Sequence, residues 1–431
     1  MNNQGKISFF TAVLMSINVM IGVGIYFNSQ LMVQNAGTCS FLGWIAAAVL
    51  LLPVIWVTAL AARIFPGEGG FYNYGKSGIN ETVGFISIWS YLVGYVGMVS
   101  AQVLGLTDIL NKQYPSITQN LVLFNAVFII ALALFSMLSI TWVSRIQGIA
   151  TILKLTPLLL VIGLLYFYWD PQLTYTGCSY ASLSSTISLA LFGYFGFEAC
   201  SNIGQYIKGG SQAVFKVILT AFFATTALYT LFHLGVLHIM GANDFATSGV
   251  QALPLFLGIT SATTVAWINI IFGWILILSF SNAVYGNMLS NVTNLAGVAQ
   301  RKLIFGASAL TVLNRFDRPV LAVIVQCLAT FLFITFVPNI NTVVELANLA
   351  VVLTLALTTL SVLCAQVRQK SYLASIVTVL SFGSCGALGY CCWLNLSKNT
   401  AKPMLYIAML IGVIGLGYAM FKTLRCCKSA K

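Results

Sequence analysis

Residues 21–26 read Ile-Gly-Val-Gly-Ile-Tyr and lie in the middle of a hydrophobic run, from about residue 7 to residue 33, that is long enough to cross a bilayer. A glycine inside a helix costs roughly 1 kcal/mol relative to alanine, so Gly22 and Gly24 together mark a weak point. Within a membrane, an interrupted backbone is tolerated where protein or a water-filled cavity surrounds it. One interpretation is a broken first helix whose unpaired backbone groups bind a substrate at mid-membrane, as in many secondary transporters. The alternative is that the two glycines only let two helices pack closely.

The composition of the chain is that of an integral membrane protein. Of its 431 residues, 59% are hydrophobic and 6% are charged, and the mean hydropathy is +0.95. Soluble domains carry about 25% charged residues. Each span needs about 20 apolar residues, and the sequence predicts twelve spans in one transmembrane domain, 1–431. They are 7–34, 38–63, 80–109, 120–142, 147–169, 183–207, 213–240, 263–293, 319–337, 341–366, 371–393 and 402–424.

The net charge of +12 is explained by orientation in the membrane. With twelve spans, 17 of the 20 Lys and Arg residues fall at or near the side that holds both termini, and Lys112, Lys398 and Lys402 fall on the other side. The positive-inside rule then makes the termini cytoplasmic, in a multi-pass protein of the cell (inner) membrane. We expect no nucleic-acid partner, because the basic residues set the topology.

The sixth span repeats the anomaly of the first. Residues 192–198 read Phe-Gly-Tyr-Phe-Gly-Phe-Glu, which places Gly193 and Gly196 at mid-span, before a carboxylate. Two interrupted helices five spans apart are typical of an inverted repeat of five helices, here about 7–169 and 183–366, with two additional helices at about 371–424. The free N–H groups at the breaks suit a carboxylate, and the free carbonyls suit an ammonium group. This pairing favours the transporter interpretation of residues 21–26.

Three motifs resemble those of the amino acid–polyamine–organocation (APC) superfamily over nearly the full length. Residues 21–26 resemble its G-[SA]-G-I-[FI] break, and residues 65–74, Phe-Pro-Gly-Glu-Gly-Gly-Phe-Tyr-Asn-Tyr, resemble its P-x-x-G-G-x-Y-x-Y loop. Residues 192–198 are similar to its [FW]-x-[FY]-x-G-[FVY]-E motif. The resemblance implies an all-α, LeuT-like fold with a five-plus-five inverted repeat and breaks in helices 1 and 6.

The resemblance also implies a substrate site at the breaks. Backbone N–H groups of Val23, Gly24 and Ile25 would bind the substrate carboxylate. Carbonyls near Ile21 and at Phe192 would bind its ammonium group. Phe192 matches the family's aromatic gate.

Two further aromatic residues and one acid complete the expected set. Tyr194 belongs to the second break, and Trp274 resembles the eighth-span tryptophan of the antiporter branch. Glu198 matches the sixth-span glutamate that couples substrate occupancy to gating, although it could simply cap the second half-helix.

Lys154 is an ionisable residue about two turns inside the fifth span. Burying an unpaired charge there costs several kcal/mol, so such a residue indicates function, here exchange of a proton with the solvent. The alternative is that its amine reaches the inner headgroups. The resemblance favours proton coupling, because proton-coupled members of the family carry a lysine at this position.

Other polar residues have weaker expected roles. Glu345 starts the tenth span and is expected at the membrane interface. Tyr91 and Tyr95 are expected to face lipid or the membrane interface for the most part, although Tyr95 could reach the cavity. Cys39 and Cys178 lie on the same predicted side, and whether they pair is left open.

The predicted function is proton-coupled, secondary active uptake of a neutral amino acid by alternating access. A neutral substrate is favoured because Glu198 is the one acid near the expected cavity. The alternative is an amino acid/amino acid or amino acid/amine antiporter without net proton coupling, and a more distant one is a nutrient sensor that does not transport. We expect no enzymatic activity, because the sequence holds no nucleophile–base pair or metal-ligand cluster. We likewise expect no cofactor and no metal. The partners are the amino acid, the proton and the lipid bilayer, and the oligomeric state is left open.

Overall fold

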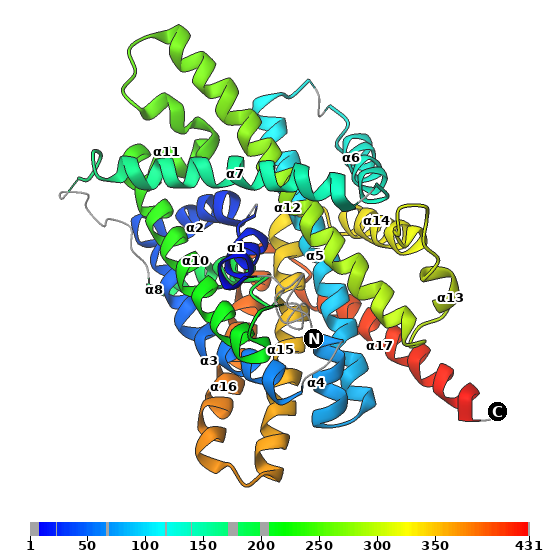
Figure 1. The fold of residues 1–431 in the computed structure, drawn as a ribbon. Coiled ribbons are helices and arrows are strands. Elements are labelled where there is room, and N and C mark those ends of the chain that lie inside the picture. The colour runs from blue at the N-terminus through cyan, green and yellow to red at the C-terminus, as the bar shows by residue number, and fades with distance from the viewer. Residues whose placement is uncertain are drawn as a thin grey trace.

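The computed structural model describes residues 8–22, 24–65, 69–116, 119–138, 140–170, 180–198 and 207–429. These residues are almost entirely helical, with one isolated bridge between Leu313 and Pro319 (Figure 1). The helices, in chain order, are α1 (Phe9–Met20), the π-helix η1 (Gly24–Asn28), α2 (Ser29–Ala36), η2 (Gly37–Cys39), α3 (Leu42–Ile64), α4 (Gly70–Gly78), α5 (Glu81–Gln113), α6 (Leu121–Ser136), α7 (Ile140–Leu165), α8 (Tyr180–Tyr194), α10 (Gly210–Met240), α11 (Ala242–Ser248), η4 (Val250–Phe256), α12 (Ala262–Gln300), α13 (Ala307–Leu310), α14 (Val320–Phe336), α15 (Ile340–Arg368), α16 (Tyr372–Asn399) and α17 (Pro403–Ser429).

The apolar helices identify a multi-pass integral membrane protein. Within the described ranges, seven helices are long and apolar enough to cross a membrane, or eight if the bent pair of α1 and the segment after it counts as one span. Three shorter apolar helices accompany them: Leu121–Ser136, Thr151–Leu165 and Val320–Phe336. Every one of the twelve predicted spans overlaps a helix, and α12 extends to Gln300, seven residues beyond the predicted end at 293.

Polar caps start several of these helices, as the short polar turns in the sequence lead us to expect. The side chain of Asn80 accepts a hydrogen bond from Val83 N at 2.9 Å at the start of α5. Asn339 does the same for Thr342 N at 3.1 Å at the start of α15. Such caps satisfy backbone donors that the first helical turn leaves free.

The first span is interrupted where the glycines predict it. α1 ends at Met20, Ile21 is extended (φ −69°, ψ 103°), and the chain resumes at Gly24 as a π-helix. The two halves of the span, Phe9–Met20 and Gly24–Cys39, are bent by 50°. Val23, inside the break, lies outside the described residues.

The second predicted break is described up to Glu198, since residues 199–206 lie outside the described part of the chain. α8 ends at Tyr194, and Gly196 has a φ of +109°, a conformation that glycine adopts without a steric penalty. A side chain on Gly196 would in addition meet Val19 Cγ1 at 2.7 Å. The second break therefore packs against the end of α1.

Helices from distant parts of the sequence surround the two breaks. α8 packs against α2, α3, α15 and α16, and α1 packs against α10 and α12. Figure 1 shows α15 and α16 as a long hairpin at its lower edge, while α17 leads away to the C-terminus. Near that terminus, Glu81 of α5 forms ion pairs with Lys76 and with Arg425 of α17.

Between α10 and α12, the chain forms the short helix α11 and the 3-10 helix η4. Cys39 is disulfide-bonded, whereas Cys178 lies outside the described residues.

Candidate functional site

The two breaks touch each other through their backbones. A side chain added at Gly24 would meet Gly193 Cα at 3.1 Å and Gly193 N at 3.6 Å. Asn28 Nδ2 donates to Leu189 O at 2.7 Å and so fixes η1 beside α8. The glycines thus serve both interpretations of the sequence, since they interrupt the helices and also allow the close approach.

The carbonyls freed by the breaks have identified partners. The Tyr229 hydroxyl of α10 lies 2.7 Å from Met20 O and 3.0 Å from Gly193 O, so it joins the last turn of α1 to that of α8. A hydroxyl has one proton and can donate to one carbonyl at a time. The Tyr229 proton therefore satisfies one of these two carbonyls at a time.

Lys154 is fully buried at the first break. Its Nζ donates to Asn18 O at 2.6 Å, near the end of α1, and Tyr26 Oη donates to Lys154 O at 3.0 Å. A third bond joins Thr151 Oγ1 to Asn18 Oδ1 at 3.0 Å. The lysine does not extend to the headgroups in this conformation, and α7 contacts the first span on both sides of its interruption.

Glu198 is buried at the second break, with an exposed fraction of 1%. Its Oε1 accepts from Tyr91 Oη at 2.9 Å and from Tyr95 Oη at 2.5 Å, and its Oε2 accepts from Gly196 N at 3.1 Å. The expectation that these tyrosines mostly face lipid is wrong, because both are 1% exposed and donate to the carboxylate. They lie one helical turn apart on α5, and residues four apart share a helix face.

The remaining predicted site residues differ in where the structure places them. Ile21, Ile25 and Phe192 are buried at the breaks, with exposed fractions of 0%, 0% and 4%. Tyr194 is also buried, but its hydroxyl donates to Trp44 O at 2.9 Å, so it faces α3. Trp274 is not brought to the breaks with the others: it is 55% exposed, and its ring lies beside that of Tyr114.

Gln102 of α5 is a site residue that the sequence reasoning missed. Its side chain is 3% exposed, and a Cβ on Gly22 would meet its Nε2 at 3.5 Å. Its Oε1 is buried without a hydrogen-bond partner. The signal for it was a glutamine inside an apolar span, because polar residues at membrane depth usually serve function.

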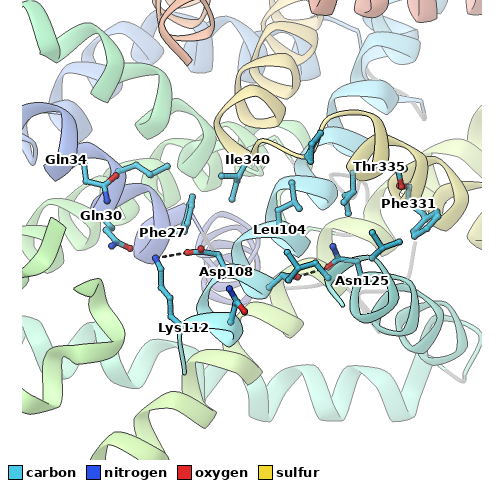
Figure 2. Close-up of a pocket in the computed structure, with 17 residues that line it drawn as sticks. Phe27, Gln30, Gln34, Leu104, Asp108, Lys112, Asn125, Phe331, Thr335 and Ile340 are labelled. Atoms are coloured by element: carbon cyan, nitrogen blue, oxygen red, sulfur yellow. Dashed lines mark hydrogen bonds and ion pairs between the residues drawn. The ribbon is translucent and has the colours of Figure 1, made fainter. Parts of the chain in front are cut away.

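A cavity of about 510 Å³ adjoins the first break (Figure 2). Figure 2 shows Phe27, Gln30 and Gln34 on one side of it, with Asn125 and Thr335 on the other. Asp108 and Lys112, also in its wall, form an ion pair of 2.8 Å. None of its lining residues falls within 21–25 or 192–198, so the cavity lies next to the breaks and does not contain them.

Residues 7–416 match the amino acid permease family. The chain is 24% identical to the branched-chain amino acid permease BcaP of Bacillus subtilis (strain 168) over 247 residues, which are 52% of either chain. It is 23% identical to the uncharacterized transporter Rv1999c of Mycobacterium tuberculosis (strain ATCC 25618 / H37Rv) over 267 residues, 61% of this chain and 58% of that one. The matches thus span little more than half the length of these relatives.

Because the family match covers nearly the whole sequence, the chain belongs to the amino acid permease family. The resemblance drawn from the three motifs is confirmed. The family consists of transporters, so the expectation that the protein is not an enzyme is also confirmed.

Proposed function

We propose that this protein is a secondary active transporter that takes up a neutral amino acid together with a proton, by alternating access. The observation that carries the proposal is the meeting of two interrupted helices at Gly24 and Gly193, with a buried lysine hydrogen-bonded beside the first interruption. In the proposed topology, twelve spans form a five-plus-five inverted repeat with two additional helices and cytoplasmic termini.

The proposed substrate site lies between the breaks. N–H groups of residues 23–25 bind the carboxylate, and carbonyls at Ile21 and Phe192 accept from the ammonium group. The Gln102 Oε1, which has no partner in its buried position, is a further acceptor for that ammonium group. A zwitterion would thereby pair with backbone groups at the breaks and with the Gln102 Oε1, which has no partner of its own.

A neutral, apolar side chain fits this site best. Glu198 already accepts from two tyrosines and one backbone N–H, so it offers little to a second cationic group on the substrate. The buried neighbours Ile21, Ile25 and Phe192 are apolar. A branched-chain substrate would agree with the name of the relative in Bacillus subtilis.

Lys154 is proposed to carry the coupled proton. A protonated amine makes a charge-assisted hydrogen bond to Asn18 O, roughly twice as strong as a neutral one. Loss of the proton weakens this bond and frees α1 to move relative to α7. Proton release and movement of the first half-helix are then one event.

Uptake into proteoliposomes tests the proposal and separates it from exchange. A radiolabelled branched-chain amino acid should accumulate when the outside is acidic, and an uncoupler should abolish the accumulation. Uptake that requires internal amino acid and ignores the pH gradient would instead establish an antiporter. Saturable binding without any flux would establish a sensor.

A further inference from the structure

A second buried carboxylate lies away from the breaks. Glu345 is in the second turn of α15 and has an exposed fraction of 0%, so the expectation that it lies at the membrane interface is wrong. It is enclosed where α15 meets α8 and α16. An ionised carboxylate in such a place costs several kcal/mol unless a cation compensates it.

No described cation faces this carboxylate. The groups around it are Ser188 of α8, Asn348 of its own helix, and Asn395 and Cys392 of α16. The thiol of Cys391 is the other titratable group nearby.

On the other helices packed against α15, Lys76 of α4 and Arg425 of α17 are ion-paired with Glu81, and Lys112 of α5 is ion-paired with Asp108. In the described part of the chain, α3 has one charged residue, Arg63, which lies in its last turn. The buried tyrosines of α5, Tyr91 and Tyr95, donate to Glu198 instead. Lys398, near the end of α16, is exposed to the surroundings.

The hydrogen bonds around Glu345 leave two acceptors unsatisfied. Its Oε1 accepts from Ser188 Oγ at 2.9 Å and from Asn395 Nδ2 at 2.5 Å, but its Oε2 has no partner. Asn348 Nδ2 donates to Ser188 O at 2.8 Å, which fixes the amide so that Oδ1 can only accept, and this Oδ1 also has no partner. A buried acceptor left unsatisfied costs about 1–3 kcal/mol.

We propose that Glu345 is a proton-binding site, occupied in this conformation, that holds α8 against α15 and α16. One proton on Oε2, directed at Asn348 Oδ1, satisfies both free acceptors and removes the uncompensated charge. A sodium ion is the less suitable occupant, because hard cations take about six oxygen ligands and two free oxygens are present.

A polar track connects Glu345 to the end of α16. Asn399, the last residue of that helix and half-buried, donates to Asn395 Oδ1 at 3.0 Å. The amide of Asn395 then donates to Glu345 through its Nδ2. These side chains form a hydrogen-bonded polar path from the half-buried end of the helix to the carboxyl group.

The position of Ser188 links the proton to movement of the second interrupted span. Ser188 lies five residues before Gly193, and its hydroxyl and carbonyl hold Glu345 and Asn348. Displacement of α8 breaks both bonds, opens the carboxyl group to water and releases the proton. Lys154 holds α1 in the same way. Its amine donates to the carbonyl of Asn18, which lies four residues before Gly22. Each interrupted span is thus held about one turn before its glycine by an ionisable side chain.

Infrared spectroscopy of the purified protein in lipid nanodiscs tests the proposal directly. Wild type at neutral pH should show the C=O stretch of a protonated carboxylic acid, and Glu345→Gln should lack it. Glu81→Gln, which alters an ion-paired carboxylate at the surface, is the matched control and should retain it. A band unchanged in Glu345→Gln would overturn the proposal. A melting temperature of the wild-type protein that rises with added sodium and not with acidic pH would also overturn it.

Asn348→Ala is the second variant, in case Glu345→Gln does not fold. The same band should remain but shift in frequency, because the acid loses its acceptor. An unshifted band would show that the proton is not directed at Asn348 and would overturn the assignment. The measurement does not depend on transport, so its failure leaves the role of Lys154 to be judged separately.

Discussion

Lys154 shows how a single residue can connect a proton to a helix. Its amine is buried, and it donates to the last turn of α1 instead of to water. The free energy of this contact depends on the charge of the amine. Among the described residues, no acidic side chain forms an ion pair with it. The residue is therefore positioned to respond to protonation.

Replacing Lys154 with alanine should reduce gradient-driven uptake about tenfold or more, a loss of at least ~1.4 kcal/mol of coupling. Exchange of internal for external substrate should fall much less, because exchange does not require net proton movement. Both rates are measured in the same proteoliposomes. Lys216→Ala, a change at an exposed lysine of α10, is the control and should alter neither rate. Equal loss of both activities in Lys154→Ala would contradict a coupling role.

Gln102 should matter for binding but not for stability. Gln102→Leu keeps most of the side-chain volume and removes a buried acceptor without a partner, so the melting temperature should stay the same or rise. The KM for the amino acid should increase about tenfold, ~1.4 kcal/mol, because the ammonium group loses an acceptor. If KM is unchanged in a well-folded variant, the amide does not contact the substrate.

At the scale of the helix, the two interruptions depend on each other. A side chain on Gly24 would meet Gly193 Cα at 3.1 Å, whereas a side chain on Gly193 would meet the ring of Trp44 in α3 at 2.7 Å. Gly196 adds a left-handed conformation that closes the second break against Val19. The glycines at the two breaks thus act as one unit, although 169 positions separate Gly24 from Gly193 in the sequence.

Gly24→Val should abolish substrate binding while leaving the protein in the membrane. Its branched side chain would collide with Gly193 and cover the backbone N–H groups at the first break. Gly163→Val in α7 is the matched control, because a side chain there meets nothing within 4 Å. Binding is measured by the substrate-induced rise in melting temperature. Normal binding by Gly24→Val would exclude the first break as the site.

At the scale of the whole molecule, the proposed direction of the chain in the membrane rests on the distribution of charge. Helix α16 provides a simple check, since Gln369 and Lys402 flank it and are both exposed. In the proposed topology, the end at Gln369 is cytoplasmic and the end at Lys402 is external.

A membrane-impermeant maleimide should label Lys402→Cys in intact cells and Gln369→Cys only after permeabilisation. Both variants are made in a background in which Cys426 and Cys427 are serine, and the labelling of that background, which keeps the other eight cysteines, is subtracted. The reverse pattern would place the termini outside and would contradict the proposed topology.

The prediction from sequence succeeded where the physical signal is local. Glycines at mid-span weaken a helix wherever it packs, so both breaks are visible in the residues themselves. It failed for Tyr91, Tyr95 and Glu345. For these residues the question is which face of a helix meets protein, and lipid is as apolar as a protein core, so hydrophobic periodicity does not answer it.

The amino-acid sequence by itself determined a multi-pass membrane protein of the amino acid permease family, with two helices interrupted at glycines and a lysine inside the fifth span. The tertiary structure decided that Glu198 binds two tyrosines of α5, that Gln102 faces the first break, and that Glu345 is enclosed by α8, α15 and α16. The reason is that a break in a helix is a property of neighbouring residues. A partner for a buried polar group is set by which distant helices pack together.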